Sequence, residues 1–174
     1  KEIPENVLHE MLEAARLSPS SQNKQRWRFI VAHNKKTRGE LALKSGFIGK
    51  FNYFIKDAPV IIVACADPSK SIRLNKQDYY LVDTTIAFHQ MMLTAWNHGV
   101  GSCWLAGFDE QKVKEILDIP TKIRVVAMSP FGYSKDKASL YDKALKTFAG
   151  SKKRLDLNKI VMYDVWGNDF RYSI

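Results

Sequence analysis

Two short segments of this sequence gather polar and glycine residues of the kinds that can hold a ligand. The first, residues 18–27 (SPSSQNKQRW), places small hydroxyls, an Asn and a Gln where a helical pattern stops. Such a turn presents several hydrogen-bond donors and acceptors together. The same composition also fits a helix stop followed by an Asx-type turn that binds nothing, so both interpretations stay open.

The second segment, residues 99–108 (GVGSCWLAGF), spaces three glycines among apolar residues. Glycine lets a backbone approach a flat ligand closely, although a glycine-softened strand explains the same pattern. Gly99 and Gly101 begin the GxGxxG fingerprint of dinucleotide-binding loops, but Trp104 stands where the third glycine belongs. The segment therefore indicates close backbone approach without that fingerprint.

Conventional catalytic and metal-binding patterns are absent from the sequence. There is no GxSxG elbow, no phosphate-binding P-loop and no evident carboxylate pair, and the four histidines show no HExxH spacing. Cys65 and Cys103 belong to no CxxC motif, so we expect two buried free thiols in a reducing compartment and no metal site. An enzyme with such a sequence often takes its chemistry from a cofactor.

The 174 residues, 45% of them apolar, fit one globular domain. The longest apolar run, residues 58–66, has the length of a strand and not of a membrane span. No signal peptide is visible either, so we expect a cytoplasmic protein. The net charge is +9, and basic side chains gather in a C-terminal extension, residues 135–174. These charges fit a solvated tail, a phosphate-bearing small molecule or nucleic acid.

Apolar spacing predicts helices interleaved with strands, which is typical of an α+β or α/β layered domain around a central sheet. The helix over residues 78–98 is apolar around so much of its circumference that it is buried or faces a partner. Pro130 and Gly132 predict a turn after the last strand. Helices are expected at 4–17, 35–44, 78–98 and from Asp109 to just before Pro120. Strands are expected at 27–32, 59–66 and 122–129, and a strand or an extended loop at 100–106.

Several motifs, in sequence order, resemble those of the nitroreductase-like FMN-dependent oxidoreductases. The family pattern A-P-S-x-x-N-x-Q-P-W-x-F is matched within residues 17–29, the strand start D-A-P-V at 57–60, and G-L-G-S-C-W-I-G-G-F at 99–108. Ile119-Pro120 and the FGY of residues 131–133 fit the later pattern, and residues 152–154 resemble the basic C-terminal stretch.

The resemblance implies an α+β, three-layer nitroreductase-like fold, with a central, mainly antiparallel sheet flanked by helices, in one FMN-binding domain over residues 1–174. It also implies an NAD(P)H oxidoreductase that passes two electrons by a ping-pong mechanism to a nitroaromatic, a quinone or a similar acceptor. The flavin N5 carries the chemistry, so no catalytic side chain is implied. Family members are homodimers with FMN in the interface, and residues 78–98 would form the dimerisation helix. Neither nucleic acid nor a membrane is an implied partner.

The resemblance further assigns the residues that would hold FMN. The polar turn would meet the flavin ring and ribityl chain, the glycine segment would offer backbone N–H groups to the N5/O4 edge, and basic side chains would meet the phosphate. An ordinary loop Asn explains residue 52 equally well, and a solvated tail is the alternative for residues 152 and 154. The implied cofactor-binding residues are Pro19, Ser20, Asn23, Gln25, Asn52, Leu105, Ala106, Gly107, Lys152 and Arg154.

Two departures from the family pattern bear on function. Arg26 replaces the proline before Trp27, which changes the turn but not its polar groups. The family's N-terminal R-R-S-x-R motif, which helps to hold FMN, would lie upstream of Lys1. Either that segment precedes the residues printed here, as we expect, or the protein binds FMN weakly. Weak binding leaves open an alternative function, an FMN-binding or sequestering protein with little turnover. A nucleic-acid-binding module is a third hypothesis, but no motif supports it.

Overall fold

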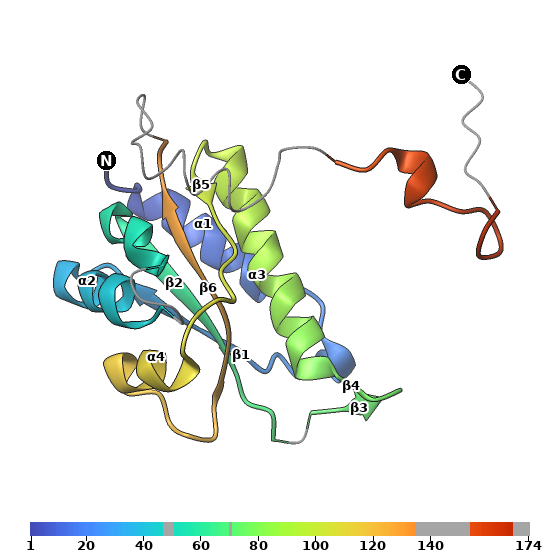
Figure 1. The fold of residues 1–174 in the computed structure, drawn as a ribbon, viewed down its shortest axis with the longest axis horizontal. Coiled ribbons are helices and arrows are strands. Elements are labelled where there is room, and N and C mark those ends of the chain that lie inside the picture. The colour runs from blue at the N-terminus through green and yellow to red at the C-terminus, as the bar shows by residue number, and fades with distance from the viewer. Residues whose placement is uncertain (47–50, 70, 135–153, 169–174) are drawn as a thin grey trace. The chain divides into compact units, whose positions relative to one another are not determined.

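The computed structural model describes residues 1–46, 51–69, 71–134 and 154–168 (Figure 1). The chain divides into two compact units, Lys1–Asp136 and Lys137–Ile174. The described part of the second unit contains one short 3-10 helix, η3 (Leu157–Lys159).

A four-stranded sheet forms the centre of the first unit. Its strands lie in the order β1 (Trp27–Ala32), β2 (Val60–Ala66), β6 (Arg124–Gly132) and β5 (Gly101–Ser102), and each neighbouring pair is antiparallel. In the middle of the register, Ile62 lies opposite Val31 on one side and Ser129 on the other. The expected antiparallel α+β sheet is therefore confirmed.

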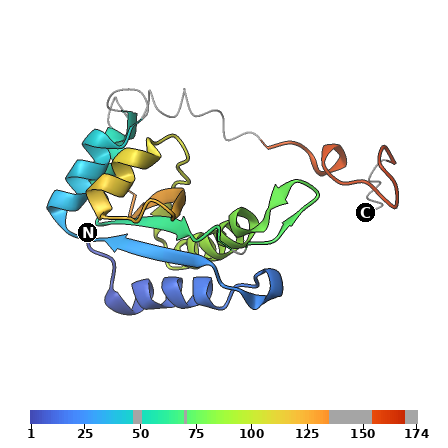
Figure 2. The ribbon, with the colours of Figure 1, turned by 90° about the horizontal axis from the view of Figure 1, so that it is seen from below.

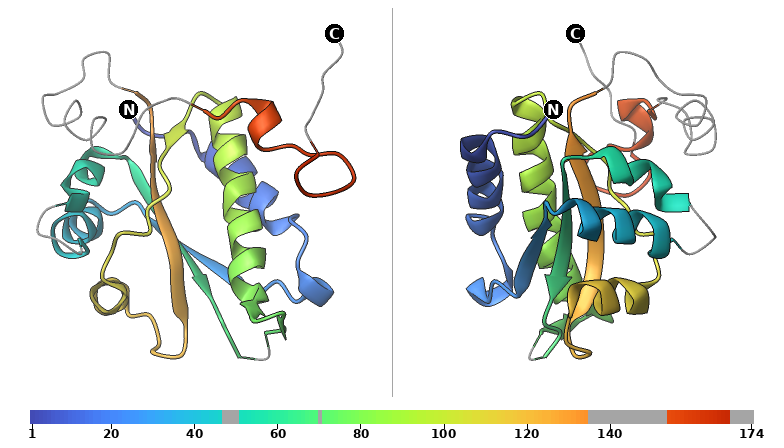
Figure 3. Two further views of the ribbon diagram at one scale, coloured as in Figure 1. Left: turned by 45° about the vertical axis from the view of Figure 1, so that its right-hand side comes forward. Right: turned by 90° about the vertical axis from the view of Figure 1, so that its left-hand side faces the viewer.

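Helices cover both faces of this sheet, as Figures 2 and 3 show. On one face lie α1 (Glu5–Arg16) and α3 (Tyr79–Asn97), and on the other lie α2 (Lys35–Lys44), the 3-10 helix η2 (Phe51–Asp57) and α4 (Glu110–Leu117). All seven residues of β2 are buried, because alternate side chains enter two separate core clusters. A strand covered on both faces needs an apolar residue at every position, which explains its uninterrupted run.

The two cysteines differ in their surroundings. Both are free, but Cys65 is buried in β2 whereas Cys103 is exposed, so the expectation of two buried thiols is wrong for Cys103. Burial raises the pKa of the Cys65 thiol to about 11, and this thiol is therefore neutral near pH 7.

The ends of two elements depart from the sequence prediction. Pro130 and Gly132 continue β6 and make no turn. A Cβ at Gly132 would lie 2.8 Å from Cδ of Pro59, so only glycine fits against that ring. A hairpin of β3 (Arg73–Leu74) and β4 (Gln77–Asp78) was not expected at all; its two-residue turn places both Asn75 and Lys76 at positive φ.

Helix α3 is buried on one side and exposes several large apolar side chains on the other. Phe88 and Met91 are fully buried in the core, whereas Leu93 and Trp96 are 51% and 75% exposed. Leu81, Val82 and Ile86 also keep about two fifths of their surface exposed. No helix within the described part of the chain is long and apolar enough to cross a membrane.

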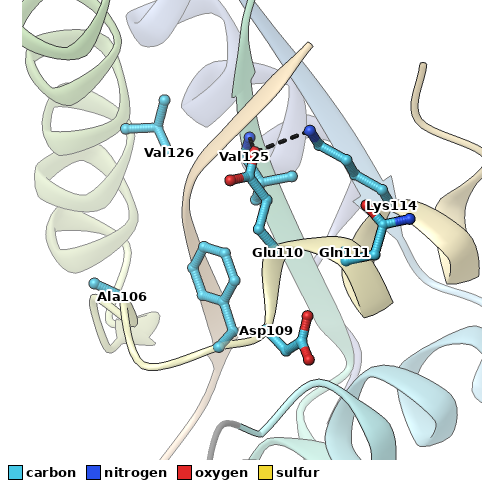
Figure 4. A pocket seen from close by; sticks show the side chains of 8 residues that line it. Ala106, Asp109, Glu110, Gln111, Lys114, Val125 and Val126 are labelled. Carbon is cyan, nitrogen blue, oxygen red and sulfur yellow. Dashed lines mark hydrogen bonds and ion pairs between the residues drawn. The ribbon is translucent and has the colours of Figure 1, made fainter. Parts of the chain in front are cut away.

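A partly exposed ion cluster fastens α4 to β6; Figure 4 shows its Glu110–Lys114 pair. Glu110 accepts hydrogen bonds from Arg124 Nε at 2.9 Å and from the backbone N–H of Val125 at 2.9 Å, and it pairs with Lys114 Nζ at 3.1 Å. Burial alone would raise the pKa of Glu110, but these three partners outweigh it and lower the pKa from 4.5 to about 2. The carboxylate therefore stabilises the folded state in its charged form.

We expect Glu110 to make stability fall in acid. Because its pKa is lower in the folded state, its contribution is complete above pH 4.5 and is lost as the pH falls from 4.5 toward 2. A shift of this size corresponds to about 3 kcal/mol in the free energy of unfolding. Urea unfolding across that range should show the loss in the wild type and a flatter profile in Glu110→Gln. Glu115→Gln, an exposed position on the same helix, serves as the control; equal profiles for the wild type and Glu110→Gln would contradict the role.

Candidate functional site

The polar turn predicted from the sequence connects α1 to β1 and includes the 3-10 helix η1 (Ser21–Asn23). Ser20 Oγ accepts a hydrogen bond from the backbone N–H of Gln25 at 3.0 Å. Gln25 Nε2 in turn donates to the carbonyl oxygen of Asn23 at 3.1 Å and to its Oδ1 at 2.9 Å. The structure thus joins Ser20, Asn23 and Gln25 in one network, with Pro19 exposed beside them.

A buried carboxylate on α3 is hydrogen-bonded to this turn. Asp83 Oδ1 accepts hydrogen bonds from both the backbone N–H and the Oγ of Ser21, each at 3.0 Å. Asp83 is 4% exposed. Sequence reasoning missed it, because a single Asp within an apolar helical pattern carries no sign of a partner 62 positions away.

The end of the glycine segment belongs to a loop, residues 105–109. Hydrogen bonds attach this loop to the rest of the unit on both sides. Leu105 and Met128 exchange two backbone hydrogen bonds, at 2.9 and 3.1 Å, which tie the loop to β6. The backbone N–H of Asp109 donates to the carbonyl of Ser45 at 2.8 Å, which ties it to the end of α2. Asp109 then begins α4 by accepting a hydrogen bond from the N–H of Lys112 at 3.2 Å.

Ala106 and Gly107 form the exposed part of this loop. Their backbone N–H groups donate to no hydrogen-bond acceptor within the portion of the chain that the structure describes. No atom lies within 4 Å of the place where a Cβ on Gly107 would stand. Two free N–H donors beside open space, on a loop held at both ends, suit a flat ligand with acceptor atoms along one edge.

Asn52 lies beneath this loop. It is completely buried, and its Nδ2 donates to the carbonyl oxygen of Gly107 at 3.2 Å and to Ser45 Oγ at 3.4 Å. Its Oδ1 is also buried and has no hydrogen-bond partner among the described residues. The side chain therefore orients the Gly107 peptide and leaves one acceptor unused, an arrangement that composition alone could not reveal.

The structure does not bring the turn and the loop together. In Figures 1 and 3 the blue turn and the yellow loop lie on opposite sides of α3. Trp104, just before the loop, packs on Phe88 of α3 with 5.4 Å between ring centroids. Within one chain the turn and the loop are thus two separate candidate half-sites, one on each side of α3.

An open depression of about 590 Å³ lies next to the loop, lined by residues that include Ala106 and Phe108 (Figure 4). Its charged groups are engaged with one another: Lys114 contacts both Glu110 and the carbonyl oxygen of Thr121. These polar atoms serve the junction of α4 and β6 and do not point to a ligand. Among the described residues, no three His, Cys, Asp or Glu side chains are grouped to hold a metal ion.

The two basic residues assigned to a phosphate belong to the second unit. Lys152 lies outside the described residues, and Arg154 is exposed. The structure therefore brings together the turn residues and, separately, Asn52 with the loop residues, while the phosphate assignment stays a prediction.

Comparison with known proteins agrees with this architecture. The model of the nitroreductase family matches residues 1–47 and 44–133. A relative from Archaeoglobus fulgidus is 31% identical over 148 residues, which cover 82% of this chain and 80% of that protein; its name joins NADH dehydrogenase and NAD(P)H nitroreductase.

Solved structures give the same result. A nitroreductase family protein from Clostridium novyi NT is 32% identical with a TM-score of 0.73, covering 98% of this chain and 87% of its own. An FMN-dependent nitroreductase from Clostridium difficile R20291 is 28% identical with a TM-score of 0.67, covering 89% and 91%. The fold, the motifs and these relatives together show that this chain belongs to the nitroreductase family.

Proposed function

We propose that this protein is an FMN-dependent NAD(P)H oxidoreductase that works as a homodimer in the cytoplasm. It would pass two electrons by a ping-pong mechanism to a nitroaromatic, a quinone or a similar acceptor. The observation that carries the proposal is the pair of N–H groups at Ala106 and Gly107, which have no acceptor among the described residues and lie on an exposed, fastened loop with open space beside the Gly107 Cα. When bound, FMN supplies the redox chemistry, accepting hydride from NAD(P)H and delivering it to the acceptor.

The loop's part is to fix the edge of the flavin. The N–H groups of Ala106 and Gly107, with Leu105 anchoring them to Met128, would donate to the N5/O4 edge of the ring. Asn52 donates to the Gly107 carbonyl oxygen, which ties this part of the loop to the buried side chain beneath it. Donors fixed in place before the ligand arrives lose little freedom on binding and stabilise charge that develops at the ring edge.

The turn's part is to meet the flavin ring and the ribityl chain through Pro19, Ser20, Asn23 and Gln25. Because α3 separates the turn from the loop within one chain, the two half-sites would meet across a pair of subunits. The exposed apolar side of α3 supports such a pair, since exposed apolar patches of this kind mark interaction surfaces.

The phosphate's partners would be Lys152 and Arg154. An Arg grips phosphate bidentately, and a Lys supplies a point charge. Riboflavin has the same ring without the phosphate, so comparing its binding with that of FMN isolates their part.

The function is tested by flavin turnover. We expect the purified protein to bind FMN, to bleach on addition of NADPH or NADH without oxygen, and to regain its absorbance on addition of menadione or nitrofurazone. Absence of FMN binding would refute the proposal. Binding without bleaching would establish the alternative instead, a flavin-binding protein with little turnover.

Substitution at Gly107 tests the loop. Gly107→Val places methyl groups where the flavin edge would lie, and the apoprotein has room for them. We therefore expect FMN binding to weaken at least tenfold, while the thermal unfolding midpoint changes little. Gly39→Ala is the control for Gly107→Ala, since both glycines have open space beside them. Tight FMN binding in Gly107→Val would remove the loop from the site.

A charge on the outer face of α3 tests the dimer. Leu93→Glu should dissociate the subunits, because an unpaired charge buried in a contact costs several kcal/mol. The adjacent Met92 packs partly against the core, so Leu93 reports more directly on the contact. Leu43→Glu, at a leucine 48% exposed on α2, is the control. Light scattering should show a dimer for the wild type and the control; a monomeric wild type that binds FMN fully would refute the interface.

A further inference from the structure

A carboxylate is buried in α3 at a place where the proposed redox chemistry gives it no task. Asp83 is 4% exposed, and the helix around it is otherwise largely apolar. Taking a carboxylate out of water is costly unless hydrogen bonds replace the lost hydration. The partners of Asp83 therefore indicate what the residue is for.

Both described partners of Asp83 belong to one residue of the turn. The backbone N–H and the Oγ of Ser21 each lie 3.0 Å from Asp83 Oδ1. Hydrogen bonds to an ionised acceptor are roughly twice as strong as those between neutral groups. Ser21 directly follows Ser20 and begins η1, so the carboxylate fixes the turn at its centre.

The turn needs such a tie because its backbone is strained. Gln22, Asn23 and Gln25 have φ values of 53°, 53° and 48°, in the left-handed region that residues other than glycine rarely adopt. Conformations of this kind persist only where the surrounding structure holds them. The hydrogen bonds among Ser20, Asn23 and Gln25 lie within the turn, whereas the bonds to Asp83 attach it to a helix.

We propose that Asp83 is the positioning residue of the flavin site, and that through Ser21 it holds residues 19–25 in the shape that meets the flavin ring and ribityl chain. This inference rests on the proposed function. Asp83 contacts no flavin atom and transfers no proton. Its neighbour Val82 and the residue one turn later, Ile86, are 39% and 38% exposed on the outer side of α3. The same stretch of helix thus carries both the tie to the turn and part of the proposed dimer contact.

The test measures the dissociation constants of FMN and riboflavin by fluorescence titration. Asp83→Ala removes both hydrogen bonds, and we expect FMN to bind about tenfold to a hundredfold more weakly. Riboflavin should weaken by the same factor, because the turn would meet the ring and the ribityl chain and not the phosphate. Asp83→Asn keeps an Oδ1 acceptor and should therefore restore most of the affinity.

Thr84→Val is the matched control. Thr84 is the next residue on α3, is fully buried, and its Oγ1 has no hydrogen-bond partner within the described chain. Removing that hydroxyl should leave the affinity for both flavins at the wild-type value. Circular dichroism of each apoprotein confirms that the variant is folded at the titration temperature.

Ser21→Ala provides a milder variant should Asp83→Ala not fold. It removes only the Oγ donor, and we expect a loss smaller than that of Asp83→Ala and equal for the two flavins. If Ser21→Ala and a folded Asp83→Ala both bind FMN with wild-type affinity, the inference is overturned. A loss of affinity for FMN that riboflavin does not share would also overturn it. A wild-type protein that binds neither flavin would overturn the proposed function and this inference with it.

Discussion

Helix α3 has two apolar sides and only one sheet to cover. Phe88 and Met91 are fully buried against that sheet, while Leu93 and Trp96 remain exposed on the other side. The described layers of the first unit cover only one of these sides, and exposing large apolar side chains to water is unfavourable. The turn and the loop flank the same helix. A second copy that covers the exposed apolar side chains of α3 would therefore also place its turn next to the loop of the first copy, and its loop next to the first copy's turn. One packing requirement would then govern both assembly and ligand binding.

The two half-sites are held by different physical means. The loop is held by backbone hydrogen bonds to Met128 and Ser45 and by the Asn52 amide, so its shape depends little on charge. The turn is held by one carboxylate. Backbone ties are insensitive to most substitutions, whereas the tie to Asp83 depends on a single side chain. The loop is therefore the more tolerant half of the site.

Elements with a clear pattern could be predicted from the sequence. Residues 27–32 and 35–44 form β1 and α2 as expected, and a continuous apolar run identified β2, because a strand buried on both faces has no alternation to show. The hairpin at residues 73–78 was missed because strands of two residues are too short to show an alternation of apolar and polar side chains. Pro130 indicated a turn, but pairing on the β5 side uses Met128 and Phe131 and skips Pro130, so its missing N–H is tolerated.

The candidate site was only partly readable in the same way. Its two segments were visible as local composition, and the assignment of Gly107 came from the family resemblance. The partners that hold those segments were not visible. Asp83 and Ser21 are far apart in sequence, and the burial of Asn52 depends on a loop 55 residues away. Such ties arise from the packing of distant elements, and one sequence carries no trace of them.

The pairing of β2 with β6 has a consequence for how the chain reaches its native state. Val60 lies opposite Phe131, so the central strand gains its second neighbour only after nearly the whole first unit has been synthesised. Until then β2, apolar on both faces, can pair only with β1. Closing a loop of that length costs chain entropy before any contact compensates for it, which slows folding. During this interval the most apolar strand of the protein presents an open edge, and nascent chains would be most prone to associate with one another at that stage.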